Sequence, residues 1–337
     1  MLADLRPADE MNGHGLGALP AEIISAGRPM VLRGAVADWP LVQAARQSDE
    51  AAIGYLERFY TGKPVTMVVA HPSERGRFGY CADAKAMNFQ RSDEQLTDVL
   101  RGLLQQRSVE QPFGIAVQAL SAPDVLPGLQ EENATPLVPA GSGARLWIGN
   151  RATVAPHFDV ADNLACVVAG KRRFVLFPPE QTANLYPGPM DVTPAGVPIS
   201  MVALDEPDFD RFPQYRDALD AALVAELEPG DAIFIPYLWW HGVQSLTGFN
   251  VLANYWWNSD PASDRYPFVQ FLRLAYQLHR DLPPAQREAW RALYGHYAFG
   301  REDPMGALDP AHQDAAPTID RDGAAKLRAL IRELLDE

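Results

Sequence analysis

The residues with the most specific chemistry are His157 and Asp159, which flank Phe158 in a His-x-Asp pattern. On a strand, residues two apart point to the same face, so this spacing brings an imidazole and a carboxylate together. A third ligand is available from His241, which follows a turn at residues 229–231 and a strand at 232–236. A lone His-x-Asp is common, but two histidines and one carboxylate on adjoining strands form the facial triad that holds non-haem Fe(II). The spacing therefore predicts one metal ion bound by His157, Asp159 and His241.

Short β-rich runs must position these ligands. Between residues 144 and 257 such runs alternate with Gly and Pro, which favours a sandwich or barrel over alternating strands and helices. Further strands are predicted at 29–33 and 65–70, and helices at 51–60 and at 21–26, where Gly27 ends the helix. Residues 186–215, the proline-rich excursion, interrupt the β pattern, and segments of this length are usually lids or binding loops.

The two ends of the chain differ from this β region. Residues 1–18 lack periodicity and are predicted to be a flexible tail. Residues 19–260 are predicted to form the β domain with N-terminal α/β elements, and residues 261–337 a helical region. Apolar residues recur there at helical spacing in three stretches, 268–278, 290–297 and 327–334. These helices either cover the β domain or pair with a second subunit, and we expect a homodimer built on them.

The composition is typical of a folded globular protein, with 337 residues, 47% of them hydrophobic and 21% charged. The formal net charge of −14 disfavours partners rich in phosphate, so neither nucleic acid nor an anionic membrane is expected to bind. No apolar run is long enough to cross a bilayer, and the first residues lack the features of a signal peptide. Only Cys81 and Cys166 occur, as expected for reduced thiols in a cytoplasmic protein.

Around these ligands the sequence resembles the JmjC-like cupins, and among them the branch of the asparaginyl hydroxylase that inhibits the hypoxia-inducible factor. The similar segments lie at roughly residues 140–257 and include HFDVADNLACVVAGKRRFVLFPPEQ, LEPGDAIFIPYLWWHGVQSL and NYWW; RPMVLRGAVADWP near the start is similar as well. The resemblance implies a mainly β fold, a double-stranded β-helix (cupin or jelly-roll) barrel with flanking and C-terminal helices. It also implies Fe(II), 2-oxoglutarate and O2, with His157, Asp159 and His241 as the iron ligands.

In this family a lysine two residues after a turn glycine commonly binds the distal carboxylate of 2-oxoglutarate. Here that position, two residues after Gly170, is Arg172, and Lys171 could reach in instead if the turn shifts by one residue. Arginine and lysine are not interchangeable at such a site. Where the branch has a hydroxyl donor, three residues before His157, this chain has Val154, with Thr153 adjacent.

Asn163 and Asn254 match positions where related proteins place amides close to the cosubstrate. The resemblance favours a dioxygenase that hydroxylates a protein or peptide side chain. A small-molecule hydroxylase is the nearest alternative. The residues at 172 and 154 also leave open a non-catalytic cupin module that binds a metal or a partner protein.

Overall fold

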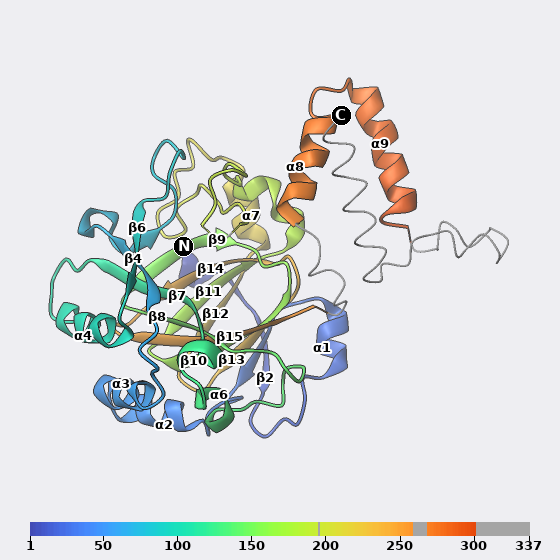
Figure 1. Ribbon diagram of the computed structural model, residues 1–337. Helices are drawn as coiled ribbons and strands as arrows, with labels where there is room; N and C mark the ends of the chain where they lie inside the picture. The colour runs from blue at the N-terminus through green and yellow to red at the C-terminus, as the bar shows by residue number, and fades with distance from the viewer. Residues whose placement is uncertain (195, 259–267, 301–337) are drawn as a thin grey trace. The chain divides into compact units, whose positions relative to one another are not determined.

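The structure is a computed structural model that describes residues 1–194, 196–258 and 268–300. The chain divides into two compact units, Met1–Trp257 and Asn258–Glu337. The first unit contains two β-sheets with helices beside them (Figure 1). In spatial order the six-stranded sheet comprises β1 (Arg6–Pro7), β12 (Leu223–Leu227), β11 (Arg172–Phe177), β14 (Trp240–Ser245), β9 (Ala152–His157) and β5 (Arg77–Phe78). The nine-stranded sheet comprises β2 (Asp9–Asn12), β3 (Met30–Arg33), β13 (Ala232–Ile235), β10 (Asp162–Ala169), β15 (Asn250–Trp257), β8 (Arg145–Gly149), β7 (Gly114–Ser121), β4 (Val65–Ala70) and β6 (Phe89–Glu94).

Neither sheet closes on itself, so the predicted closed barrel is not what the described chain forms. The order of strands in each sheet is linear, with β1 and β5 at the edges of one sheet and β2 and β6 at the edges of the other. The chain instead passes from sheet to sheet and buries the inner face of each against the other, as in a sandwich. The prediction of a mainly β fold with flanking helices is confirmed at this coarser level.

The inner core between the sheets follows from strand alternation. On β11, Phe174 and Leu176 are buried in one cluster with Ala165 and Val167 of β10 and with Leu252 of β15. Residues two apart on a strand share a face, so Arg172, Asn163 and Asn254 lie on the same inner faces as these apolar residues. This is the space in which the candidate site lies.

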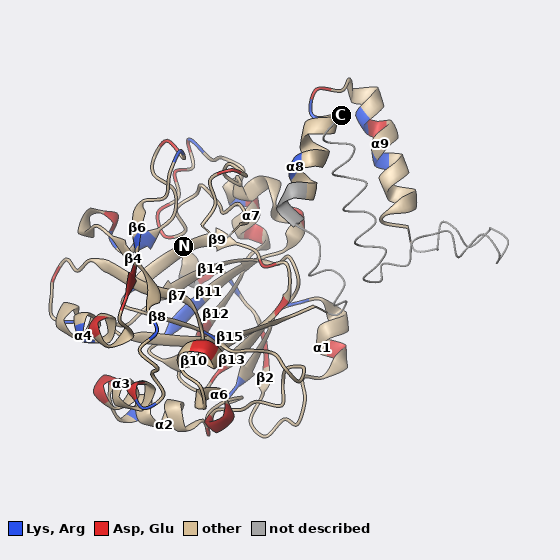
Figure 2. Cartoon of the chain, in the orientation of Figure 1, with Lys and Arg blue, Asp and Glu red and all other residues tan. Residues whose placement is uncertain are grey.

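The outer face of the nine-stranded sheet carries the second, larger core. Helices α2 (Pro40–Gln47), α3 (Asp49–Glu57) and α4 (Leu96–Gln106) supply Leu41, Leu56 and Leu100 to a cluster that contains Leu164 and Cys166 of β10. The remaining helices of this unit are α1 (Ala21–Ala26), α5 (Ala122–Val125), α6 (Leu129–Glu132) and α7 (Tyr215–Ala221). Acidic residues lie on α1, α3 and α6 at the surface (Figure 2).

Local signals predicted several elements well. Helix α1 ends at Gly27, whose left-handed φ of 59° suits a residue without Cβ. Strand β4 has the predicted bounds, and β3 lacks only the first predicted residue. Helix α3 begins two residues earlier than predicted, because the Ser48 side chain accepts a hydrogen bond from the Ala51 amide and caps the helix.

The N-terminal residues are not a loose tail throughout. Strand β1 pairs in parallel with β12, and β2 pairs in parallel with β3, so each forms an edge of its sheet. Three of the four residues of β2 are polar and exposed, and Met11 alone is partly buried against the larger core, so the segment is held largely by its backbone pairing with β3. A hydrophobic pattern therefore could not predict it.

The proline-rich excursion lies on the outer side of the six-stranded sheet. The Ser200 amide donates to the carbonyl of Pro156 at 2.7 Å, and the Tyr80 hydroxyl donates to the carbonyl of Val192 at 2.9 Å. Leu204 lies so close to Gly242 of β14 that a Cβ there would sit 2.7 Å from the leucine Cδ2. The excursion is thus fixed next to the strands that carry the two histidines.

The second unit is described only through α8 (Phe268–His279) and α9 (Pro284–Tyr297), which confirm two of the three predicted C-terminal helices. The His279 ring stacks on Trp290 with ring centroids 4.7 Å apart, and its Nε2 lies 2.8 Å from the Tyr294 hydroxyl. The third predicted helix, at 327–334, lies outside the described residues. None of the described helices is long and apolar enough to cross a membrane.

Candidate metal centre

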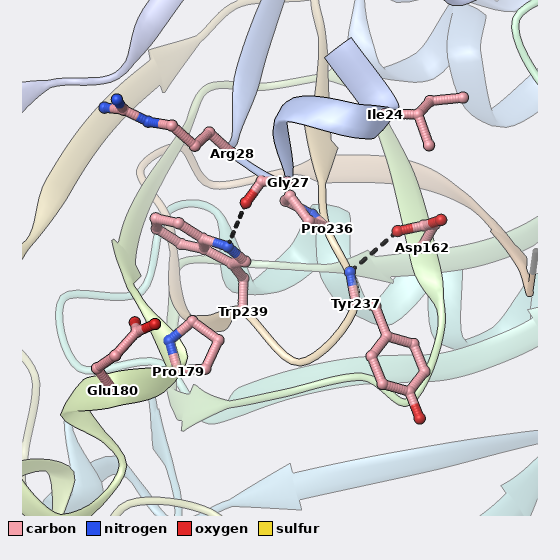
Figure 3. Close-up of a pocket in the computed structure, with 9 residues that line it drawn as sticks. All are labelled: Ile24, Gly27, Arg28, Asp162, Pro179, Glu180, Pro236, Tyr237 and Trp239. Atoms are coloured by element: carbon pink, nitrogen blue, oxygen red, sulfur yellow. Dashed lines mark hydrogen bonds between the residues drawn. The ribbon is translucent and has the colours of Figure 1, made fainter. Parts of the chain in front are cut away.

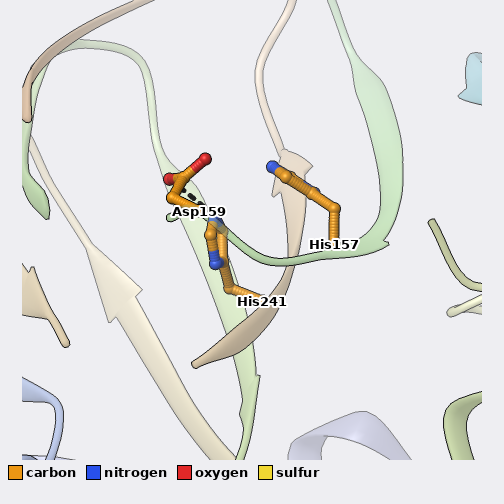
Figure 4. Close-up of side chains that lie close together, drawn as sticks. All are labelled: His157, Asp159 and His241. Atoms are coloured by element: carbon orange, nitrogen blue, oxygen red, sulfur yellow. Dashed lines mark ion pairs between the residues drawn. The ribbon is translucent and has the colours of Figure 1, made fainter. Parts of the chain in front are cut away.

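The three predicted ligands lie together at one end of the two sheets (Figure 4). His157 is the last residue of β9, Asp159 lies in the link to β10, and His241 is the second residue of β14. The register of β9 and β14 places the two histidines opposite each other, and their ring centroids are 4.3 Å apart. One candidate ligand atom from each residue lies within 4.8 Å of the others, so one ion could contact all three.

Backbone carbonyls orient both imidazoles. Nδ1 of His157 lies 3.0 Å from the Ala155 carbonyl, and Nδ1 of His241 lies 3.0 Å from the Trp239 carbonyl. A carbonyl only accepts, so each Nδ1 carries the proton and each Nε2 presents its lone pair to the shared space. This is the tautomer that a metal-binding histidine needs.

Burial keeps His241 neutral. Its exposed fraction is 4%, and burial lowers its pKa to about 4, with repulsion from His157 adding to the shift and the nearby Asp159 opposing it. Oδ2 of Asp159 lies 3.7 Å from Nε2 of His241. A neutral imidazole beside a carboxylate is the donor set that a divalent transition metal accepts, and three protein ligands leave coordination positions open.

The Asp159 carboxylate is held by the nine-stranded sheet. Its Oδ2 accepts hydrogen bonds from Nδ2 of Asn163 on β10 at 3.0 Å and from Nε1 of Trp256 on β15 at 2.9 Å. Asn163 is held in turn, because its Oδ1 accepts from Nδ2 of Asn254 at 2.8 Å. Both predicted amides therefore adjoin the metal site, and Oδ1 of Asn254 is buried without a hydrogen-bond partner.

The two candidates for binding an anionic cosubstrate lie in different environments. Arg172 shares the inner face of β11 with Phe174 and Leu176 and is 6% exposed. Lys171 lies in the turn before β11, with a side chain that is 57% exposed and paired with Glu228 at 2.5 Å. Only the arginine points into the space between the sheets.

The buried Arg172 guanidinium has few hydrogen-bond partners and no counter-ion among the described residues. One Nη donates to the Trp147 carbonyl at 3.4 Å, and Nε has no partner. Burial lowers the pKa of Arg172 to about 10, so the group stays charged near neutral pH. A buried charge without a counter-ion is costly, and a carboxylate is the group that a guanidinium binds best.

Thr153 lies away from this space. Between His157 and Val154 the pairing of β9 with β14 shifts by one residue, which places Val154 opposite Val243 and Thr153 opposite Gln244. Gln244 donates to the Thr153 hydroxyl at 3.4 Å and accepts from Arg173, whereas Val154 packs against the inner core. The structure thus does not bring Thr153 together with the other predicted site residues, because this β-bulge exchanges the faces of the strand.

Sequence reasoning did not identify Trp256 as a hydrogen-bond donor to Asp159. The available signal was its position two residues after Asn254 on the same strand, hence on the same inner face. Trp147 was not singled out either, although its carbonyl contacts Arg172 and its ring packs edge-on against Trp256 at 6.3 Å.

Comparison with known proteins identifies relatives that match part of this chain. HSPB1-associated protein 1 from Homo sapiens is 39% identical over 118 residues, which cover 34% of this chain and 24% of the human protein. Lysine-specific demethylase JMJ31 from Arabidopsis thaliana is 34% identical over 124 residues, covering 36% and 22%. tRNA wybutosine-synthesizing protein 5 from Danio rerio is 31% identical over 160 residues, covering 43% and 44%.

The matched segments span less than half the length of each of these relatives. The narrower resemblance to the asparaginyl hydroxylase stays a prediction. A family model for the cupin-like domain matches residues 17–263, which contain both sheets except the edge strands β1 and β2, and the whole candidate site from His157 to Asn254. The chain therefore belongs to the cupin-like domain family.

Proposed function

We propose that the chain is an Fe(II)- and 2-oxoglutarate-dependent oxygenase that hydroxylates a protein or peptide side chain. The observation that carries the proposal is the buried Arg172, a cation without a carboxylate partner among the described residues, in the same inner space as the triad. Arg172 lies four residues before Leu176 on β11, and Leu176 pairs with His241 of β14. Arg172 and His241 are therefore about 13 Å apart along the strand direction. A side chain and a dicarboxylate together can bridge that distance.

Each residue of the site has a part in this function. His157, Asp159 and His241 would hold the Fe(II), which when bound supplies the redox chemistry for the reaction of O2 with 2-oxoglutarate. Arg172 binds the distal carboxylate of the cosubstrate and thereby orients its other end toward the triad. Asn163 and Trp256 keep the Asp159 carboxylate in place, and the unpartnered Oδ1 of Asn254 offers one more polar contact inside the same space.

A protein substrate is supported by the relatives, one of which is named for association with another protein and one for lysine demethylation. The direct test incubates the purified chain with Fe(II), 2-oxoglutarate and air and measures succinate. We expect succinate without added substrate and none from His157→Ala. A wild-type chain that binds iron and 2-oxoglutarate yet releases no succinate, alone or with a peptide library, would favour the non-catalytic module instead.

A further inference from the structure

A pocket of about 440 Å³ lies beside the triad and does not include any of its side chains. Its walls come from the end of α1, the start of the segment after β11 and the loop between β13 and β14 (Figure 3). The lining residues that matter for its chemistry are Gly27, Pro179, Glu180, Pro236, Tyr237 and Trp239. Its volume is in the range of pockets that bind small molecules or single side chains.

Two hydrogen bonds tie this pocket to the metal centre. The Leu238 amide, between two lining residues, donates to the Asp159 carbonyl at 3.0 Å, and the Trp239 carbonyl accepts from Nδ1 of His241. Asp162, which also lines the pocket, follows Asp159 by three residues, a separation of at most about 11 Å between Cα atoms. The lining of the pocket therefore comes within the length of a few peptide residues of the metal site.

The lining combines an aromatic ring with an unpaired negative charge. Tyr237 is 40% exposed, and the prolines beside it add apolar surface. Glu180 is exposed, and no hydrogen bond or ion pair joins it to another residue in the described part of the chain. The Asp162 carboxylate, which also lines the pocket, accepts a hydrogen bond from the Tyr237 amide.

Arg28, the one cation among the described lining residues, does not pair with Glu180. Arg28 extends away from Tyr237 in Figure 3, and its guanidinium lies 3.9 Å from the Asp9 carboxylate. An anionic occupant would thus meet the Glu180 carboxylate and a protein whose net charge is −14. A cation with an apolar stem suits this pocket, because the ring attracts the charge and the carboxylate pairs with it.

We propose that this pocket receives a lysine or arginine side chain of a protein substrate, a few residues from the side chain that is hydroxylated. The inference rests on the proposed function, since it names a substrate class for the same site. The aliphatic stem packs on Tyr237 and the prolines, and the charged end pairs with Glu180.

The test measures binding rather than turnover. The probes are acetylated, amidated heptapeptides of Gly and Ser with Lys, Arg, Gln or Glu at the centre, titrated into the full chain by calorimetry. We expect the Lys and Arg peptides to bind about fivefold or more tightly than the Gln peptide, with the Glu peptide weakest. Added salt should reduce the difference.

Two variants locate the preference. Glu180→Gln should remove the advantage of Lys over Gln, and Tyr237→Ala should weaken both cationic peptides. Glu110→Gln, which changes another exposed carboxylate outside the pocket, should leave the preference unchanged. Equal binding of all four peptides, or a preference that survives Glu180→Gln, would overturn the proposal.

Succinate release by the wild-type chain is measured in parallel. A cation preference without succinate would count against the oxygenase assignment and leave the pocket assignment standing. Succinate without a cation preference would do the reverse.

Discussion

Replacing Arg172 with methionine should stabilise the cosubstrate-free protein and weaken the binding of 2-oxoglutarate. The side chain is 6% exposed, its Nε lacks a partner, and its contact with the Trp147 carbonyl is long at 3.4 Å. Without a bound anion the guanidinium is therefore a buried charge with little compensation. Methionine fills a similar volume without that desolvation cost, and its flexible thioether adapts to irregular space.

The expected magnitudes follow from these contacts. Replacing poorly compensated buried charge by apolar groups stabilises by about 1–4 kcal/mol, so Arg172→Met should raise the melting temperature of the cosubstrate-free protein by several degrees. The same change removes a charged hydrogen bond to the cosubstrate, which contributes about 1.5–3 kcal/mol, so 2-oxoglutarate should bind roughly ten- to hundredfold more weakly. At a 2-oxoglutarate concentration of about 100 times the wild-type Kd, the wild type gains about 2.7 kcal/mol and the variant only a fraction of it.

Thermal melts with and without 2-oxoglutarate measure both effects, with calorimetric titration for the affinity. Lys171→Met is the matched control, because that side chain is exposed and pairs with Glu228 outside the inner space; it should leave cosubstrate binding unchanged. If Arg172→Met destabilises the free protein and 2-oxoglutarate still raises its melting temperature as in the wild type, the reasoning is refuted. A large effect of Lys171→Met on binding would assign the cosubstrate to the lysine.

Four further outcomes are expected. His157→Ala should abolish stoichiometric iron retention measured by elemental analysis, and a variant that still binds one iron per chain would show that the ligand set is wrong. Trp256→Phe removes one of the two donors to the Asp159 carboxylate and should weaken metal binding about 10–100-fold in a competition titration with a chelator, whereas an unchanged Kd would make the indole a packing residue. The pKa of His241 is about 4 in the folded chain, against an ordinary value of 6.5, so the unfolded chain binds more protons between pH 4 and 6.5. The free energy of unfolding of the metal-free protein should therefore fall as the pH is lowered from about 6.5 to about 4. The same pH dependence in His241→Asn would contradict this origin. The intact chain should be a dimer by light scattering and a chain ending at residue 260 a monomer, and an intact monomer at micromolar concentration would exclude the dimer.

Much of the candidate metal site could be predicted because it depends on local rules. The His-x-Asp spacing predicts that His157 and Asp159 lie together, as they do although Asp159 follows the end of β9, and the strand after the turn at residues 229–231 leads directly to His241. The same alternation distinguishes Arg172 from Lys171 once the start of β11 is known.

The parts that sequence reasoning missed depend on pairing between distant segments. The bulge opposite Val243 decides whether Thr153 or Val154 faces the inner space, and a one-residue shift between two strands leaves no mark in the composition of either. Strand β2 pairs with the edge of β3, and its own residues, of which Met11 alone is apolar, carry no strand pattern. The support of Asp159 by Trp256 likewise joins segments almost a hundred residues apart.

The candidate metal ligands are held by both sheets, so a bound ion would also help to hold the two sheets together. The two histidines extend from the six-stranded sheet, whereas the Asp159 carboxylate accepts hydrogen bonds from Asn163 and Trp256 of the nine-stranded sheet. An ion bound to all three would act as a cross-link between the layers, and its binding energy would oppose their separation. Loss of the ion would then make local opening easier at the end of the sheets that carries the triad. Amide hydrogens should exchange faster at the end of β9 and the start of β14 than at the opposite end of the same strands. If the bound ion is the proposed iron, chains without it should be cleaved faster by a protease at this end of the two sheets.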